Sequence, residues 1–175
     1  MIVLLYLLAI APKLLLDFLL KGKKHPGLAQ RFGFSLPVAN KPVIWLHAVS
    51  VGEIKAAQPL FRELRKRFPN HFFLITTTTE TGNGEAKRSL VGADAFSYLP
   101  VDFKWVVRRW VKQFRPELFL LVESDFWPNL LSALKQSGCK NILVSGKLSE
   151  RSAHRFKTFS RFAKKLFSRF DLLCI

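Results

Sequence analysis

The chain has 175 residues, 28 Lys and Arg against 12 Asp and Glu, and a formal net charge of +16. Its hydrophobic fraction of 49% excludes a disordered segment, because such segments lack the apolar residues that pack a core. The only cysteines, Cys139 and Cys174, exclude a small scaffold built on disulfides. The excess of positive charge predicts an anionic partner, which is nucleic acid, a phosphorylated substrate or an anionic membrane surface.

The first 24 residues are strongly apolar and predict a membrane anchor. Residues 1–10 are almost wholly apolar, and the pattern continues to Leu20 with charges at Lys13 and Asp17. A spanning helix needs about 20 apolar residues, so the segment fits one span, a helix lying in the membrane interface, or a buried core helix. The basic residues that follow would keep the rest of the chain cytoplasmic; they are Lys21, Lys23 and Lys24.

The remainder of the chain predicts an irregular connection and then an α/β domain. Residues 25–42 contain three prolines and two glycines, which favour turns. From residue 43 onward, short apolar runs alternate with longer amphipathic ones. This alternation indicates βαβ units in a parallel sheet with both faces covered by helices.

The boundaries of these elements follow from apolar periodicity and from turn residues. The expected strands are Val43–Val49, Phe72–Thr76, Ala95–Leu99, Leu118–Glu123 and Asn141–Ser145, with a sixth beginning at Asp171. The expected helices are Glu53–Phe68, Gly84–Leu90, one capped by Asp102 and ending at Phe114, Trp127–Gln136 and Glu150–Phe170.

Chemistry in such a sheet belongs at the carboxyl ends of the strands, and His47–Glu53 follows the first strand. Gly52 permits a tight turn or the close approach of a ligand. Glu53, in the first helical turn, is able to accept a proton from a substrate hydroxyl. The alternative is that Glu53 only complements the helix dipole.

A threonine-rich tract, Thr76–Gly82, follows the second strand. Its hydroxyls are able to bind sugar or phosphate oxygens, helped by the N-terminus of the next helix. The alternative is a set of ordinary β-branched residues followed by a turn. The glycines here match neither a dinucleotide-binding fingerprint nor a P-loop.

Two acids, Glu123 and Asp125, follow the fourth strand. Helix capping explains Asp125 but leaves Glu123 unexplained, so Glu123 is a candidate site residue. At the start of the last helix, Arg151 and Arg155 are candidates for binding an anion. That helix has a Phe-rich side and a basic side. Either the Phe side packs on the core and the basic side is solvated, or the surface binds anionic lipid.

The remaining signals for nucleic acid and metal are weak. No zinc-finger or aromatic RNP pattern is present, and the four His and two Cys lack the spacing of metal ligands. We therefore expect neither a metal nor nucleic acid. A non-catalytic basic α/β module that binds a membrane surface or nucleic acid stays open as an alternative to an enzyme.

Six stretches, in their order and spacing, resemble the Kdo (3-deoxy-D-manno-octulosonic acid) transferases of lipopolysaccharide synthesis. The His-Ala-Val-Ser-Val-Gly-Glu and Trp-Pro-Asn segments are the most specific, and the match runs from about Arg31 to the end of the chain. The stretches are Arg31–Phe34, His47–Glu53, Thr76–Gly82, Tyr98–Asp102, Glu123–Asn129 and Leu148–Ser152.

This resemblance implies the amino-terminal half of a GT-B glycosyltransferase built from two Rossmann-like domains. The family transfers Kdo from CMP-Kdo to a lipid A precursor at the cytoplasmic side of the bacterial inner membrane. It inverts the anomeric centre and needs no metal or other cofactor. We therefore expect a lipid A precursor, CMP-Kdo and the inner membrane as partners.

The resemblance also implies roles for individual residues. Glu53 falls at the family's general base, and Glu123 falls at the first acid of its Glu-Thr-Glu-x-Trp-Pro-Asn pattern, which is assigned to transition-state stabilisation. Ser124 and Asp125 replace the Thr and the second acid and keep their functional groups. The implied substrate-binding residues are His47, Ser50, Gly52, Thr78, Thr79, Gly82, Asp125 and Arg151.

Two features depart from the family. Ser145-Gly146-Lys147 stands where the family usually has Asn-Ala-Arg, and Lys does not reproduce the bidentate geometry of Arg. The chain also stops where the family continues into a carboxy-terminal nucleotide-sugar domain. We expect an anchor over residues 1–24, a connection over 25–42, an acceptor-binding domain over 43–175, and no turnover of CMP-Kdo by this chain alone.

Overall fold

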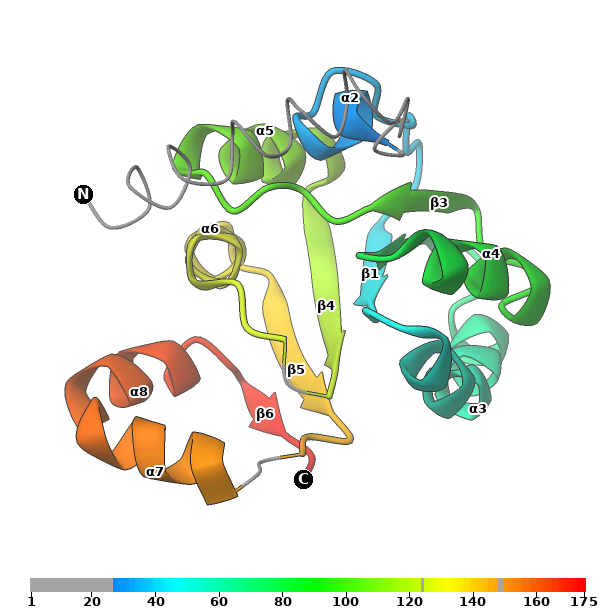
Figure 1. Cartoon of the computed structure of the whole chain (residues 1–175). Helices are drawn as coiled ribbons and strands as arrows, with labels where there is room; N and C mark the ends of the chain where they lie inside the picture. The colour runs from blue at the N-terminus through cyan, green and yellow to red at the C-terminus, as the bar shows by residue number, and fades with distance from the viewer. Residues whose placement is uncertain (1–26, 124, 148–149) are drawn as a thin grey trace, which may run out of the picture.

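The computed structural model describes residues 27–123, 125–147 and 150–175, so the anchor expected over residues 1–24 lies outside the described residues. The described chain forms a sheet in which every paired strand is parallel, in the order β3-β2-β1-β4-β5-β6 (Figure 1). This is the strand order of a Rossmann fold, and it confirms the expected Rossmann-like parallel sheet. The strands are β1 Val43–His47, β2 Phe72–Thr77, β3 Ala95–Tyr98, β4 Pro116–Val122, β5 Lys140–Val144 and β6 Leu172–Leu173.

Helices cover both faces of the sheet, as expected. One core cluster joins α3 and α4 to one face, and a second joins α5, α6 and α8 to the other. The described helices are α2 Leu28–Arg31, α3 Val51–Arg67, α4 Glu80–Ser89, α5 Lys104–Phe114, α6 Pro128–Gln136, α7 Glu150–Thr158 and α8 Ser160–Phe167. None of these helices is long and apolar enough to cross a membrane.

Several boundaries differ from the sequence prediction, each for a local reason. The first strand ends at His47 because Ser50 caps α3, and its side chain accepts a hydrogen bond from the Glu53 N–H. Helix α4 begins four residues before the expected Gly84, because the Thr79 hydroxyl caps it. Side-chain caps of this kind satisfy backbone N–H groups that the helix leaves free.

The long final helix expected over residues 150–170 is two helices. Phe159 has φ −103° and ψ 49° and separates α7 from α8. Just before this break, the Thr158 hydroxyl donates to the carbonyl oxygen of His154 at 3.0 Å. A β-branched residue that bonds back to the preceding turn bends a helix, so Thr158 accounts for the break.

Asp102 does not cap α5, and that prediction was wrong. The residue at the N-cap position is Phe103, whose side chain makes no capping bond. The Asp102 carboxylate caps α6 instead, and accepts from the backbone N–H groups of Asn129 at 3.0 Å and Leu130 at 2.8 Å. The two helices pack side by side, so a residue that precedes α5 reaches the start of α6.

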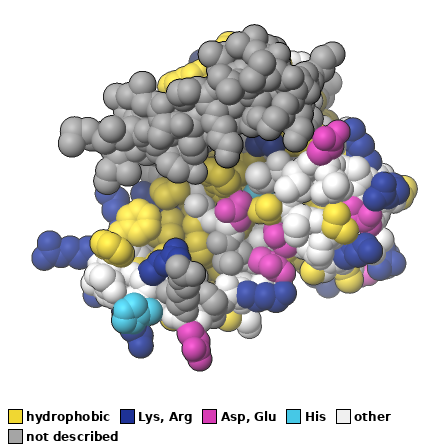
Figure 2. Space-filling model, viewed as in Figure 1, with side chains coloured by type: hydrophobic (Ala, Val, Ile, Leu, Met, Phe, Trp, Pro, Cys, Tyr) yellow, Lys and Arg dark blue, Asp and Glu magenta, His cyan; other side chains and the backbone are white. Residues whose placement is uncertain are grey.

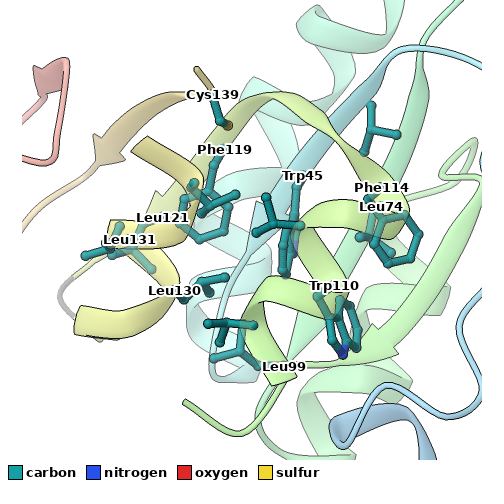
Figure 3. Close-up of a cluster of buried hydrophobic side chains, with 14 of the residues drawn as sticks. Trp45, Leu74, Leu99, Trp110, Phe114, Phe119, Leu121, Leu130, Leu131 and Cys139 are labelled. Carbon is teal, nitrogen blue, oxygen red and sulfur yellow. The ribbon is translucent and has the colours of Figure 1, made fainter. Parts of the chain in front are cut away.

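An aromatic cluster on the face covered by α5 and α6 fixes the centre of the sheet (Figure 3). Trp45 of β1 is fully buried; its ring stacks on Trp110 at 5.4 Å between centroids and meets Phe119 edge-on at 5.3 Å. Its indole N–H donates to the Thr76 hydroxyl at 2.8 Å. Large buried aromatics contribute strongly to core stability, so β1 is held between β2 and β4 on a rigid core.

The connection before β1 includes a short helix, α2, in a region that the sequence predicts as irregular. Arg31, which ends α2, donates to the carbonyl oxygen of Thr78 at 2.5 Å, and its guanidinium lies 4.9 Å from the centroid of the Tyr98 ring. The Trp110 indole donates to the carbonyl oxygen of Gln30 at 3.1 Å. Residues 28–31 are therefore tied to the ends of β2 and β3 and to α5.

The two cysteines should differ sharply in reactivity. Cys139 is buried in the core, and burial raises the pKa of its thiol to about 12, whereas Cys174 is exposed. Because the thiolate is the reactive form, we expect one fast-reacting thiol in the native chain and two after unfolding in guanidinium, measured with a chromogenic disulfide reagent. Two fast thiols in the native chain would contradict the position of Cys139.

Candidate functional site

The candidate site lies between β1 and β4, where successive strands of the chain stop being added on one side of β1 and begin to be added on the other. β1 pairs with β2 on one side and with β4 on the other, so the connections from β1 and β4 leave in opposite directions. A crevice opens at such a reversal, outside the carboxyl ends of the strands. Acidic side chains lie near the middle of the face seen in Figure 2, with Lys and Arg around them.

Glu53 lies in the first turn of α3, immediately beyond β1. Its carboxylate accepts from the Val49 N–H at 2.6 Å and from the Ser50 hydroxyl at 3.1 Å. Ser50 in turn accepts from the Glu53 N–H at 3.4 Å. This reciprocal arrangement resembles a capping box. Glu53 therefore stabilises the start of α3, in addition to any role in binding a ligand. A carboxylate has about four lone-pair positions, which leaves acceptor capacity for a ligand.

Glu123 directly follows β4 and has a left-handed backbone, with φ 64°. Non-glycine residues adopt this conformation at a cost of about 1–2 kcal/mol. Its N–H donates to Val144, and its carboxylate lies 2.8 Å from the Lys147 ammonium. The strained turn therefore directs an acid toward the carboxyl end of β5, where Lys147 lies.

Lys147 connects the two acids electrostatically. The hydrogen bond and charge of Glu123 raise the pKa of Lys147, and the charge of Glu53 raises it further. Glu53 and Glu123 thus act on one cation at the same edge of the sheet. The sequence singled out Lys147 only as a departure from the family, and the structure pairs it with Glu123, one of the two predicted acids.

His47, at the carboxyl end of β1, is fully buried in a polar network. Its Nδ1 lies 3.0 Å from the carbonyl oxygen of Thr76 and 3.1 Å from the Thr76 hydroxyl. Since the carbonyl can only accept, Nδ1 carries the proton and Nε2 presents a lone pair. Among the described residues Nε2 has no hydrogen-bond partner, and it lies 3.9 Å from the Asp125 carboxylate.

Asp125 lies beside His47 and does not cap α6, so that alternative was wrong. Its carboxylate accepts from the Trp127 indole N–H at 3.0 Å, while Asp102 satisfies the backbone of α6. Burial raises the pKa of the Asp102 carboxyl, and the hydrogen bonds from Asn129 and Leu130 oppose that rise. Because Asp102 caps α6, the Asp125 carboxylate is left to accept from Trp127, 3.9 Å from His47.

The threonine tract divides into structural and available hydroxyls. The Thr79 hydroxyl accepts from the Gly82 N–H at 3.0 Å and donates to the carbonyl oxygen of Val49 at 3.0 Å, so its role is structural. The Thr78 hydroxyl is buried, and no residue in the described part of the chain bonds to it. Of the predicted hydroxyls, Thr78 is therefore the one that retains free hydrogen-bonding capacity for a ligand.

The two predicted glycines have different physical explanations. Gly82 is buried, and a Cβ there would lie 2.9 Å from the carbonyl oxygen of Val49 and 2.8 Å from the Thr79 hydroxyl. The close packing of α4 on the loop after β1 explains this glycine without a ligand. Gly52 is exposed, and a Cβ there would meet only the Ser50 hydroxyl, at 3.9 Å. Nothing within the described chain requires a glycine at position 52.

The structure gives less information about the remaining predicted residues. Ser124 and Ser149 lie outside the described residues, and the side chain of Arg151, at the start of α7, is not described. Arg155 is exposed on α7. No group of three His, Cys, Asp or Glu side chains within the described ranges could hold a metal ion.

Residues that sequence reasoning missed surround the predicted ones. Trp45 and Asn129 belong to them: Trp45 donates to Thr76 beneath His47, and the Asn129 side chain donates to the carbonyl oxygen of Asp102 at 2.6 Å. Asn129 is the last residue of the Trp-Pro-Asn segment, so the only sequence signal was its place in that motif.

The two glycines give a matched pair of stability tests. Gly82→Ala should lower the free energy of unfolding by about 1–3 kcal/mol, because the Cβ overpacks against backbone. Gly52→Ala should leave it unchanged or raise it by up to about 1 kcal/mol, because alanine favours the helix. Urea unfolding of both variants measures the difference, and equal destabilisation would contradict these environments.

Asp102 should matter for stability through α6. Asp102→Ala removes the acceptor for two backbone N–H groups, and we expect a loss of about 1–2 kcal/mol, typical of a lost N-cap. Glu63→Ala is the control, because Glu63 makes only an exposed ion pair with Lys66 and such pairs contribute little. Similar urea midpoints for Asp102→Ala and the unsubstituted chain would rule out the capping role.

Comparisons with known proteins show which family the chain belongs to. Residues 26–175 match the family model of 3-deoxy-D-manno-octulosonic-acid transferase (kdotransferase). The 3-deoxy-D-manno-octulosonic acid transferase of Chlamydia trachomatis is 33% identical over 169 residues, which cover 94% of this chain and 39% of that protein. That of Haemophilus influenzae is 33% identical over 174 residues, covering 95% and 41%, and that of Bordetella pertussis is 38% identical over 133 residues, covering 73% and 30%.

Among solved structures, the glycotransferase of kitacinnamycin aligns with 75% of this chain and 38% of its own, at 13% identity and a TM-score of 0.40; this likeness is too low to inform the site. The chain spans about two fifths of the length of the chlamydial and Haemophilus relatives. With most of its length matched at about one-third identity, the chain belongs to the Kdo transferase family, whose amino-terminal domain it matches.

Proposed function

We propose that this chain is the acceptor-binding half of a GT-B Kdo transferase that acts in lipopolysaccharide biosynthesis. The whole enzyme transfers Kdo from CMP-Kdo to a lipid A precursor, with inversion. The observation that carries the proposal is the convergence of Glu53, Glu123 and Lys147 at the edge where β1 and β4 diverge. A non-catalytic basic module would predict scattered acids, so this convergence favours the transferase.

Glu53 is the general base in this proposal. Its carboxylate takes the proton of an acceptor hydroxyl while that oxygen attacks the anomeric carbon of Kdo. The bond between that carbon and the CMP phosphate breaks, and the phosphate leaves with the electron pair, so one displacement inverts the centre. The capping bonds from Val49 and Ser50 fix the carboxylate, and a fixed base gains from its orientation.

Glu123 supports the positive charge that develops during the transfer. A glycosyl centre becomes oxocarbenium-like in the transition state, and a fixed carboxylate stabilises it. Lys147 holds this carboxylate in place through the 2.8 Å ion pair. The left-handed backbone at Glu123 fits a position where strain is retained for function.

The acceptor would bind around these acids. Gly52 permits the close approach of the ligand to α3, and His47 Nε2 and the Thr78 hydroxyl, which lack partners within the described ranges, offer hydrogen bonds. Asp125 supplies a further hydrogen-bond acceptor beside His47, and Arg151, at the start of α7, supplies a cation for a phosphate or carboxylate. Ser50, Thr79 and Gly82 act indirectly, by shaping the loops that follow β1 and β2.

The transfer takes place at the cytoplasmic side of the bacterial inner membrane, where a lipid-linked acceptor is presented. The apolar residues 1–24 anchor the chain there in this proposal, with the lysines that follow them on anionic headgroups. CMP-Kdo binds mainly to a carboxy-terminal domain of the family's two-domain architecture. No metal or other cofactor takes part in the proposed step.

A chimera tests this function directly. Residues 26–175 replace the corresponding segment of the Haemophilus influenzae relative, and transfer of labelled Kdo to a lipid A precursor is measured. We expect an active chimera, and Glu53→Gln should lower its rate by about 10²–10⁴-fold, the usual contribution of a general base. Gln keeps a hydrogen-bond acceptor for the Val49 N–H, so the start of α3 is preserved.

Glu63→Gln is the matched control, because Glu63 lies on the same helix, is exposed, and forms an ion pair with Lys66 at the surface. We expect it to keep the rate of the chimera. A folded Glu53→Gln chimera with undiminished Kdo transfer would remove Glu53 as the base. A folded chimera that binds neither acceptor nor donor would remove the proposed function.

A further inference from the structure

A long basic groove runs between α5 and α6, away from the acids of the candidate site. It consists of two adjoining cavities of about 400 and about 420 Å³, which share Arg108, Ala133 and Gln136. In Figure 1, α6 lies between α5 and α8, and α8 contributes to one wall. The cations that line the groove are Lys104, Arg108, Lys112, Arg115, Lys165 and Arg169.

Most of the charge in this groove is uncompensated, and Arg169 alone of these cations contributes to the shift in the pKa of a described acid, Asp102. No acidic residue is among the described residues that line it, and the structure gives none of the six cations an ion pair within the described ranges. Lys104, Arg108 and Lys112 follow one another at i, i+4 spacing along α5, and like charges at this spacing destabilise a helix. An anionic ligand would remove this repulsion.

The groove also offers hydrogen-bonding groups that suit phosphate oxygens. Ser132 and Gln136 line it between the cations. Arg169 is partly fixed, because its guanidinium donates to the carbonyl oxygen of Pro128 at 2.5 Å. From Lys104 to Arg115 the helix rises about 17 Å, so the groove is long enough to bind several phosphate groups at once.

The whole face around the groove carries the excess charge of the protein. The helices on this side, α5 to α8, hold 11 Lys and Arg and one Glu, whereas α3 and α4 on the opposite face hold seven and four. The chain's net charge of +16 is therefore concentrated on one side of the sheet. Such an asymmetric surface orients a protein on a flat, extended anion.

Exposed aromatic side chains on the same helices favour lipid over nucleic acid. Trp105 on α5 is 55% exposed and Phe162 on α8 is 52% exposed. A second groove, apolar and of about 470 Å³, lies between α7 and α8. Lys164 of α8 lines this apolar groove, and the next residue, Lys165, lines the basic one. Cations beside exposed Trp and Phe suit the headgroup region of a membrane.

We propose that the groove between α5 and α6 is a docking site for the headgroups of anionic phospholipids. The groove contains neither Glu53 nor Glu123. It holds the face formed by α5 to α8 against the membrane. The inference rests on this face alone and would stand if the proposed transfer reaction were wrong.

The test is vesicle co-sedimentation of the full 175-residue chain. The vesicles contain either phosphatidylcholine alone or phosphatidylcholine with 30% phosphatidylglycerol. A triple variant, Lys104→Gln, Arg108→Gln and Lys112→Gln, removes three groove cations with a residue that favours helices as well. We expect its partitioning onto anionic vesicles to fall by about 100-fold, at about fivefold for each cation, with no change on neutral vesicles.

A matched variant removes the same charge from the opposite face: Lys55→Gln, Arg62→Gln and Arg67→Gln on α3, all exposed. We expect a loss of less than about fivefold, because these residues face away from the membrane. Equal losses for the two variants would overturn the proposal, since net charge alone would then explain binding. Unchanged partitioning of a folded groove variant would also overturn it.

A third arm identifies the occupant. Binding of a fluorescent single-stranded DNA to the unsubstituted chain and to the groove variant is measured by anisotropy at the same salt concentration. If the groove variant loses binding to DNA and keeps binding to anionic vesicles, the site takes nucleic acid and the lipid proposal is wrong. Circular dichroism melting confirms that each variant is folded.

Discussion

The position of β1 between β2 and β4 is the constraint on which the site depends. Trp45 buries this strand against Trp110 and Phe119, and its indole bonds to Thr76 on the neighbouring strand. Because the register of β1 is fixed in this way, His47 is buried at the carboxyl end of the strand and the next residues form the loop that caps α3. Packing in the core, and not contacts at the surface, therefore determines the position of Glu53.

Much of the fold follows from the sequence, and the reasons for the errors are local. Buried strands such as Phe72–Thr77 are continuous apolar runs, so their pattern is unmistakable. Asp102 was wrongly assigned to α5, because sequence shows only the nearest helix and its carboxylate caps a helix 26 residues later. The break at Phe159 also escaped detection, since the apolar periodicity of α7 continues into α8.

The site was predictable as a set of segments but not as a set of contacts. Glu53 and Glu123 were found because strand ends in a parallel sheet share an edge. The ion pair of Lys147 with Glu123 depends on how the chain turns after β4 and β5, and both turns use left-handed residues, Glu123 and Ser145, that carry no glycine signal. Conversely, Gly82 looked like a ligand contact, and its explanation is packing against Val49.

The central claim is that the acceptor binds at the carboxyl edge between β1 and β4. Its most direct test is an NMR titration of the isotope-labelled chain with a lipid A precursor in detergent, with detergent alone as the reference. Binding at the proposed site predicts amide shifts concentrated at Gly52, Thr78 and Glu123, with smaller changes on α4. Shifts confined to the amino edge of the sheet, or to α3 and α4 beyond their first turns, would contradict the claim.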